Sequence, residues 1–430
     1  MSHKFPSKFK KFLSVFGPGL ITGAADDDPS GIATYTQTGA KFGYGQLWTV
    51  IAMLPLMIAT QEACARIGAV NGKGLAAVIK ANYSKKVLYA AVLLVVVANT
   101  INIGADIGAL AAAVQLLLPI NFVILTLGFT ALILILEIFT TYRFYARILK
   151  WLALTLIAYP ITVFIVNQPW ATIFKATFLP HIELNFEFFF IITGILGTTI
   201  SPYMFFWQAS QEVEEEKILH LIKANRKPIL GKKFMLNLRI DNVVGMLFSE
   251  FATWSIIVVA ATVLHQNGIT DVASATDAAK ALEPLVNTFT NAGFLSKLIF
   301  AFGIIGLGLL AIPVLSGSAA YALTEAFNMD SGLNLKLKKA HGFYGVITIA
   351  TIIGLMINFI GIDPIKALVF TAVFNGVAAV PLLFLIARIA RNRKIMGKFR
   401  SGWLSHIGVW TTFLVMLASA IAMFYTLARR

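Results

Sequence analysis

The chain has 430 residues, of which 58% are hydrophobic and only 13% are charged. Soluble domains carry roughly 25% charged residues, so this composition excludes one or two soluble domains and indicates a membrane protein with many spans. The formal net charge is +15, and Cys64 is the single cysteine. A disulfide within the chain and a cysteine-rich metal site are therefore excluded.

Apolar runs of about 20 residues are long enough to cross a bilayer as helices, and eleven such runs follow one another along the chain. We predict an all-α integral membrane protein with eleven transmembrane helices, at roughly 12–44, 46–70, 87–117, 121–141, 146–167, 187–211, 236–264, 293–323, 341–361, 365–389 and 403–427. Several runs exceed 25 residues, so we expect these helices to be tilted, interrupted or extended beyond the lipid.

The basic residues are unevenly divided between the segments that connect these spans. With a cytoplasmic N-terminus, 28 of the 35 Lys and Arg residues fall on the inner side. Because inner loops of membrane proteins are enriched in Lys and Arg, we predict a cytoplasmic N-terminus, an outside C-terminus and a prokaryotic cell membrane as the location. This distribution explains the basic net charge without a nucleic-acid partner. The N-terminal segment lacks a small-residue cleavage site and is read as mature protein, not as a signal peptide.

The first predicted span is interrupted by "DDDPSG", which holds Asp26, Asp27 and Asp28 followed by Pro29. A carboxylate at mid-membrane costs about 2.5 to 3.5 kcal/mol, and proline removes a backbone donor from a helix, so the cluster indicates a functional site. Successive helical residues are about 100° apart. We therefore expect one aspartate to bind a ligand while the others line a wet vestibule.

The sixth predicted span contains a second break, "GTTISPYMFF", around Pro202. Two broken helices five spans apart are typical of inverted-repeat transporters, whose half-helices end near the middle of the membrane. We predict one polytopic domain over 1–430 with a LeuT-like fold, in which helices 1 and 6 are broken. Its two five-helix inverted repeats cover about 12–167 and 187–389, and an extra helix covers about 403–427.

The segment "GPGLITGAADDDPSG" resembles the first helix of the Nramp family of divalent metal transporters, where Gly-Pro-Gly precedes an Asp-Pro-Gly-Asn motif. "FGYGQLW", "NGKGLAAVI" and "DAAKALEPL" resemble further family segments in the same order. The resemblance places Asp28 on the family's metal-binding aspartate and Gly31 on its asparagine. In the sixth span it places Thr198 on an alanine whose carbonyl binds metal and Ser201 on the metal-binding methionine.

Two more residues belong to this predicted metal site. Asp27 lies beside Asp28, and Asn375 in "TAVFNGVAAVP" lies near a position where the family carries a polar side chain that faces the metal. The alignment slips by about two residues there, so a metal-binding role and a helix-packing role both remain open for Asn375.

The departures from the family pattern suggest which ion is carried. Ser201 offers a hard oxygen in place of a soft thioether, and Gly31 offers no side chain. A site with one carboxylate, hydroxyls and carbonyls in a roomier cavity suits Mg²⁺, which keeps several of its waters. We therefore expect a member of the Nramp-related magnesium transporter branch that takes up partly hydrated Mg²⁺, and also Mn²⁺, by alternating access.

The resemblance also bears on proton coupling. The family has an acidic pair in its third span, where this chain has Asp106 and Ala109, and histidines in its sixth span, where this chain has Tyr203 and Gln208. Tyrosine and glutamine do not titrate near neutral pH. We therefore expect uptake without proton coupling, driven by the membrane potential.

Other acidic residues lie within the spans. We expect Glu62 and Glu137, near the membrane edges, to pair with Arg66 or Arg143, while the deeper Glu250 is a weaker candidate for lining the cavity. Asp241 also falls within a span. The segment "QEVEEEKILH" after the sixth span is read as a solvated helix end balanced by two lysines, Lys217 and Lys223.

Three alternatives stay open. The first is a proton-coupled Mn²⁺/Fe²⁺ importer. The second is a sodium-coupled amino-acid transporter of the same fold, although the aspartates would repel a substrate carboxylate. The third is an intramembrane enzyme, but we find no catalytic residues, no histidine spacing for zinc and no P-loop. We expect no cofactor, and as partners only the transported divalent cation and the lipid bilayer, with no nucleic acid and no obligate protein.

Overall fold

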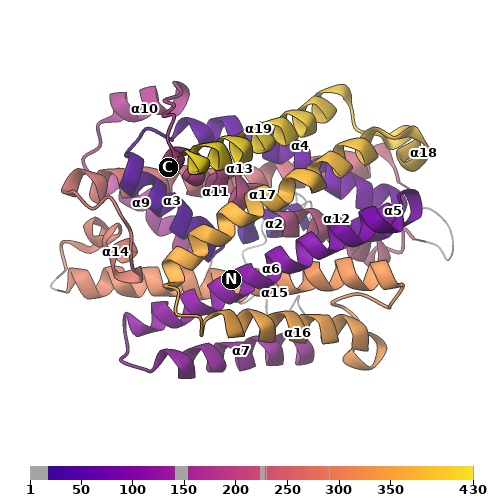
Figure 1. Cartoon of the computed structure of the whole chain (residues 1–430), viewed down its shortest axis with the longest axis horizontal. Helices are drawn as coiled ribbons and strands as arrows, with labels where there is room; N and C mark the ends of the chain where they lie inside the picture. Colours follow the sequence, from indigo (N-terminus) through magenta and orange to yellow (C-terminus); the bar gives the residue numbers. More distant parts are fainter. Residues whose placement is uncertain (1–17, 141–153, 223–227, 229, 290, 430) are drawn as a thin grey trace, which may run out of the picture.

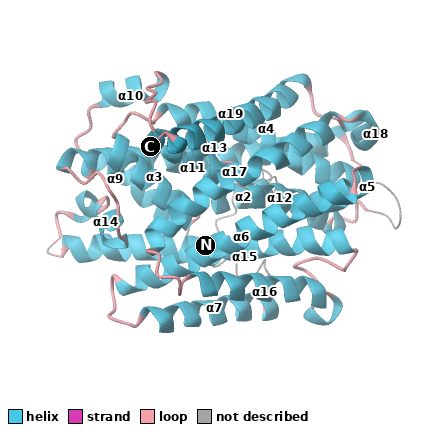
Figure 2. Ribbon diagram, viewed as in Figure 1, coloured by secondary structure: helices cyan, strands magenta, loops and turns pink. Residues whose placement is uncertain are grey.

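The computed structural model describes residues 18–140, 154–222, 228, 230–289 and 291–429. Within these residues the regular structure is helical and contains no strand (Figure 2). Such a result is expected for a chain that crosses a bilayer, because a helix satisfies its backbone hydrogen bonds internally.

Eight of the predicted spans are continuous helices within a few residues of the expected bounds. They are α4 (Trp48–Asn71), α6 (Lys85–Gln115), α7 (Phe122–Phe139), α13 (Lys232–Val263), α15 (Ala292–Phe327), α16 (His341–Ile357), α17 (Pro364–Arg391) and α19 (Trp403–Ala428). Of the span predicted at 146–167, the described part forms the 3₁₀ turn η1 (Leu154–Ile157) and α9 (Ala158–Ile165).

Both predicted breaks are present. The first span consists of α2 (Pro18–Asp26) and α3 (Pro29–Phe42), and the sixth consists of α11 (Phe186–Thr199) and α12 (Pro202–Ile218). Pro29 and Pro202 each begin the second half-helix, where the missing N–H has no intrahelical partner to lose. Proline alone does not break the helices of this chain, because α4, α15 and α17 each contain an internal proline and stay continuous.

The connecting segments hold short helices that the sequence analysis did not predict. They are α5 (Leu75–Asn82), α10 (Trp170–Phe178), α14 (Ala275–Lys280) and α18 (Arg393–Met396), with the 3₁₀ turns η2 (His265–Asn267), η3 (Glu283–Val286), η4 (Leu337–Lys339) and η5 (Gly397–Phe399). In Figure 1, α10 and α14 lie at one end of the long helices and α5 and α18 lie at the other. The connecting segments that the charge pattern assigns to opposite sides of the membrane therefore lie at opposite ends of the long helices.

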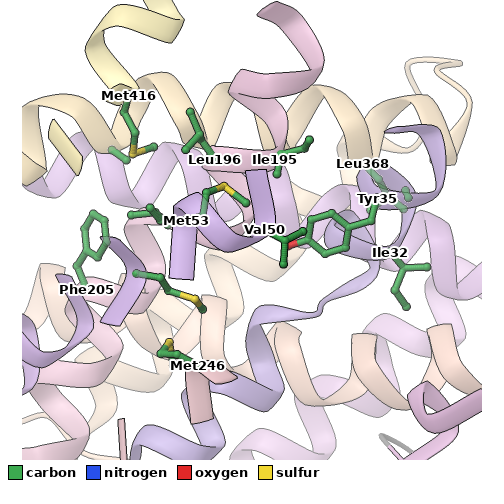
Figure 3. Close-up of a cluster of buried hydrophobic side chains, with 14 of the residues drawn as sticks. Ile32, Tyr35, Val50, Met53, Ile195, Leu196, Phe205, Met246, Leu368 and Met416 are labelled. Carbon is green, nitrogen blue, oxygen red and sulfur yellow. The ribbon is translucent and has the colours of Figure 1, made fainter. Parts of the chain in front are cut away.

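The helices pack around two apolar clusters. One joins α3, α4, α11, α13, α17 and α19, and Figure 3 shows part of it, with Tyr35, Met53, Leu196 and Met246 contributed by four different helices. The other joins α6, α7, α15 and α16. The broken helices belong to both clusters: α3 and α11 contribute to the first, α2 contributes Ala25 to the second, and α12 contributes to each. They are therefore surrounded by protein where their backbone is irregular.

Glycines bring the first half of each broken helix against a neighbour. A Cβ at Gly23 of α2 would collide with the backbone of Gly245 in α13, and a Cβ at Gly197 of α11 would collide with Ala372 and Gly376 in α17. Small residues allow membrane helices to approach closely in this way. The two helix breaks are therefore held between α13 on one side and α17 on the other.

Candidate functional site

The two helix breaks lie next to each other and are joined by hydrogen bonds. The Tyr203 hydroxyl, at the start of α12, donates to the carbonyl of Ala25 at the end of α2, at 2.9 Å. The hydroxyls of Tyr35 in α3 and Thr199 in α11 are 3.0 Å apart. All four half-helices therefore meet at one buried position.

Asp28 lies at the centre of this position and is 1% exposed. It is the N-cap of α3: its Oδ1 accepts hydrogen bonds from the Gly31 N–H at 2.8 Å and from the Ser30 hydroxyl at 2.6 Å. The Ser30 hydroxyl is also 3.4 Å from Thr198 Oγ1, across the break in the sixth span. The cap orients the carboxylate and leaves Oδ2 directed away from the helix axis, toward α6.

Asn102 of α6 connects the acidic residues on this side. Its Nδ2 donates to Asp28 Oδ2 at 3.2 Å and to Asp106 Oδ2 at 3.1 Å, and its Oδ1 accepts from Asn375 Nδ2 at 3.0 Å. Asn375 of α17 therefore lies two hydrogen bonds from Asp28. Asn102 is not among the site residues predicted from the sequence, although its position four residues before Asp106 places both on one helix face.

The three consecutive aspartates point to different sides of the break, as predicted. The expectation that the other two line a wet vestibule is wrong, because Asp26 and Asp27 are both fully buried. Asp26 and Asp27 are directed toward α13, where the Ser249 hydroxyl donates to Asp26 Oδ2 at 2.5 Å. Ser249 Oγ and Thr253 Oγ1 lie 3.5 Å and 3.4 Å from Asp27 Oδ1. The structure thus brings Asp28, Thr198 and Asn375 together, while Asp27 has its polar neighbours on the opposite side of the break.

The remaining predicted site residues border the break in the sixth span. Ser201 is the N-cap of α12, and its buried Oγ has no hydrogen-bond partner among the described residues. A Cβ added at Gly31 would lie 3.2 Å from both Thr198 Oγ1 and Tyr35 Cε2. The expectation that Gly31 enlarges the cavity is therefore wrong for the space directly beside it, because the Thr198 hydroxyl and the Tyr35 ring occupy that space.

Among the described residues, no group of three or more His, Cys, Asp or Glu side chains is arranged to hold a metal ion. A cation at Asp28 would thus be held by one carboxylate with hydroxyl, amide and carbonyl oxygens, and water would complete its coordination.

The acidic residues near the membrane edges have structural partners. Glu62 forms an ion pair with Arg66, as predicted. Glu137 is buried, and the Ser316 hydroxyl shares its one hydrogen between the two carboxylate oxygens, which lie 3.1 and 3.0 Å from Ser316 Oγ. Its predicted partner Arg143 lies outside the described residues.

The acidic segment at the end of α12 differs from its prediction as a solvated helix end. Glu212, Glu214 and Glu216 are buried, because α12 packs against α4, α5 and α15. The predicted balance by Lys217 is confirmed for Glu214, with a distance of 2.9 Å between Lys217 Nζ and Glu214 Oε1. Lys223 lies outside the described residues.

Polar contacts also tie the first turns of α2 to α12 and α13. The Thr22 hydroxyl donates to Gln208 Oε1 at 2.5 Å, and Gln208 Nε2 donates to Glu212 Oε1 at 2.8 Å. Asp241 Oδ2 accepts from the Gly19 N–H at 2.7 Å, which satisfies a free backbone donor at the start of α2. Gln208 and Asp241 therefore act here as hydrogen-bonding residues between helices.

Comparison with known sequences agrees with these features. Residues 19–426 match the sequence model of the family described as natural resistance-associated macrophage protein-like, or Nramp. The divalent metal cation transporter MntH of Caldanaerobacter subterraneus subsp. tengcongensis is 27% identical over 433 residues, 98% of this chain and 95% of that protein. The protein of the same name from Bacillus subtilis is 26% identical and covers 95% of this chain and 91% of its own length.

Solved structures show the same fold. The manganese transporter of Eremococcus coleocola, in complex with an aromatic bis-isothiourea substituted compound, superposes with a TM-score of 0.75 at 16% identity, covering 98% of this chain and 89% of that one. The nucleobase-cation-symport-1 family transporter Mhp1 in a closed conformation gives a TM-score of 0.55 at 13% identity, covering 96% and 92%. The predicted LeuT-like architecture is confirmed, while the repeat boundaries and the metal-binding roles of individual residues stay predictions.

We expect Asn102→Ala to destabilise the protein more than Asn99→Ala, its matched control one turn earlier in α6. Asn102 makes three side-chain hydrogen bonds at the site, whereas Asn99 donates one, to the Leu315 carbonyl. At about 0.6 kcal/mol for each hydrogen bond within a membrane protein, the losses are about 2 and about 0.6 kcal/mol. Unfolding of both purified variants in detergent micelles measures the difference. Equal losses would show that the Asn102 network does not support the fold.

Proposed function

The chain belongs to the Nramp family, and from this premise we propose that it carries divalent metal cations across the membrane by alternating access. The names of its relatives support divalent metal transport. The observation that carries the proposal is the buried carboxylate of Asp28 at the meeting point of two broken helices. Broken helices provide free backbone carbonyls and helix ends that bind ions in transporters of this architecture.

Each residue at the proposed cation site has its own role. Asp28 Oδ2 supplies the negative charge, and Asn102 holds it in place from α6. Ser201 Oγ and Thr198 Oγ1 supply neutral oxygens from the sixth span, and Asn375 reaches the site through Asn102. Backbone carbonyls at the ends of α2 and α11 are the remaining ligands that the protein supplies to the ion. Because one carboxylate is present, the ion keeps part of its water.

We propose Mg²⁺ as the preferred ion and Mn²⁺ as a second substrate. Hard oxygen ligands favour Mg²⁺, whereas a thioether favours softer ions. Ser201 places an unpartnered hydroxyl at the start of α12, where the resemblance to the family would place a thioether. The crowding beside Gly31 limits the size of the cavity on that side, so the preference rests on the chemistry of Ser201 rather than on added space.

We further propose that transport is not coupled to protons. Tyr203 donates its hydroxyl hydrogen to the Ala25 carbonyl, and Gln208 bonds to Thr22 and Glu212, so both hold helices together. A dication gains about 4.6 kcal/mol per 100 mV of membrane potential, twice the value for a single charge. The membrane potential alone can therefore drive accumulation.

Asp28→Ala is expected to abolish saturable uptake of Mg²⁺ and Mn²⁺ into vesicles, a loss of more than about 100-fold, since even outer-shell partners of metal sites contribute 10- to 100-fold. Because alanine also removes the cap of α3, Asp28→Asn is the sharper variant: asparagine caps helices well but lacks the charge. The exposed Asp330→Ala is the control. Normal uptake by a folded Asp28→Asn variant would refute the role of this carboxylate.

Ser201→Met should shift selectivity from Mg²⁺ toward Mn²⁺ by about tenfold, an effect of about 1.4 kcal/mol, because a thioether replaces a hard oxygen. Ser201→Ala, which removes the hydroxyl without adding sulfur, distinguishes loss of a ligand from gain of a soft one. Adding Gly31→Asn to Ser201→Met should strengthen the shift if Thr198 and Tyr35 make room. The readout is uptake of each ion in competition. An unchanged ratio in folded Ser201→Met protein would exclude this position as a selectivity determinant.

Uptake of Mg²⁺ should depend on an inside-negative potential and leave the pH inside the vesicle unchanged. Asp106 is the remaining acid of the family's pair, and it is held by Asn102. A pH-sensitive dye in the vesicles and a potassium diffusion potential measure the two quantities together. Metal-dependent acidification that disappears in Asp106→Asn would show that protons move through Asp106, and the chain would then be a proton-coupled transporter.

A further inference from the structure

The side of the first helix break that faces α13 contains a second group of oxygen atoms, separate from the one around Asp28. Asp26 and Asp27 approach it from the end of α2, and Ser249 and Thr253 approach it from α13. Ser249 and Thr253 are four residues apart and therefore share one helix face. All four side chains are buried.

The hydrogen bonds in this group do not satisfy its oxygens. Each hydroxyl carries one hydrogen, and the hydrogen of Ser249 is used by Asp26 Oδ2 at 2.5 Å. The 3.5 Å separation between Ser249 Oγ and Asp27 Oδ1 therefore joins two atoms that both bear lone pairs. Asp26 Oδ1 and Asp27 Oδ2 have no hydrogen-bond partner among the described residues.

A third carboxylate near this group also lacks hydrogen-bond donors. Glu250, next to Ser249, is 3% exposed, and neither of its carboxylate oxygens has a hydrogen-bond partner among the described residues. It lies close enough to Asp26 and Asp27 for their charges to interact. No ion pair within the described part of the chain involves any of these three acids.

We propose that Asp26, Asp27, Ser249 and Thr253 form a second cation site, with Glu250 as a nearby source of negative charge. Buried ionised groups are stable only when they are paired or bind a metal. Ser249 lies within hydrogen-bonding distance of both carboxylates and Thr253 within that of Asp27. Two carboxylates and two hydroxyls are ligands for a hard cation bound through oxygen, such as Mg²⁺ or Na⁺. The site contains no sulfur or imidazole, so softer transition metals gain nothing there.

The second site goes beyond the proposed transport function. It is a proposal about where a cation binds, and it does not require that this cation is carried across the membrane. It uses the opposite side of the same helix break, so a cation there lies one residue along the chain from Asp28. Its charge offsets the repulsion between Asp27 and Asp28, which a single cation at Asp28 leaves in place. The break can then hold three adjacent aspartates inside the protein.

The test is calorimetry of the purified full-length protein in detergent, in metal-free buffer with choline as the only salt cation. Asp28→Ala removes the proposed transport site, and Mg²⁺ and Na⁺ are titrated separately into this variant. We expect one of the two ions to bind, which identifies the occupant. Adding Ser249→Ala and Thr253→Val to Asp28→Ala should weaken that binding by about tenfold or more.

Two controls test whether the effect belongs to the site. Ser255→Ala removes a buried hydroxyl of α13 whose hydrogen bond, among the described residues, goes to the Phe251 carbonyl of its own helix, so binding should be unchanged. Thr253→Ser keeps the hydroxyl and should keep binding. If the variant with both α13 changes does not fold, Ser249→Ala alone in the Asp28→Ala background serves as the test.

Two results would overturn the second site. Asp28→Ala protein that binds neither ion would show that Asp26, Asp27 and Glu250 are neutralised by protons instead. Unchanged binding after removal of the Ser249 and Thr253 hydroxyls would place the cation elsewhere. Neither result would affect the transport proposal, which depends on the loss of uptake in Asp28→Asn.

Discussion

Burial of the Asp28 carboxylate, in a part of the protein that water does not reach freely, constrains the structure around it. Its two oxygens must be matched by donors from the chain, since burial without partners costs several kcal/mol. The helix break supplies the Gly31 N–H and the Ser30 hydroxyl, and α6 supplies the Asn102 amide. The break is therefore the means by which a charge can be held here, because a continuous helix would have no free backbone donor to offer.

The same constraint explains the surroundings of the site. Irregular backbone inside a membrane protein has to be enclosed by protein, and glycine contacts bring α13 against α2 and α17 against α11. Tyr203 and Tyr35 then close the gap between the broken helices with hydrogen bonds. Tyr203 replaces a family histidine in the resemblance, and a tyrosine at this position gives a fixed donor that stays neutral near pH 7.

Three adjacent aspartates would repel one another if they shared one environment. The structure separates them, with Asp28 directed toward α6 and its two predecessors directed toward α13. Relatives named for divalent metal cation transport match the sequence of this chain, and a solved manganese transporter shares its fold. Its own chemistry at the break consists of carboxylates, hydroxyls and amides, which is a harder set of ligands than one with a thioether.

The sequence by itself determined the helical class, the approximate bounds of the spans, the two breaks and the presence of carboxylates at the first break. These follow from local properties: the length of apolar runs, the position of proline beside a polar N-cap, and the cost of a charge in a membrane. Only the tertiary structure decided which residues meet. Asn102, Ser249 and Thr253 are ordinary polar residues within apolar helices, and nothing in the sequence marks them. Glu212 and Glu216 are buried, although the charge of their segment predicts exposure to solvent. Such contacts depend on how helices far apart in the chain rotate and pack, and a pattern along one helix does not contain that information.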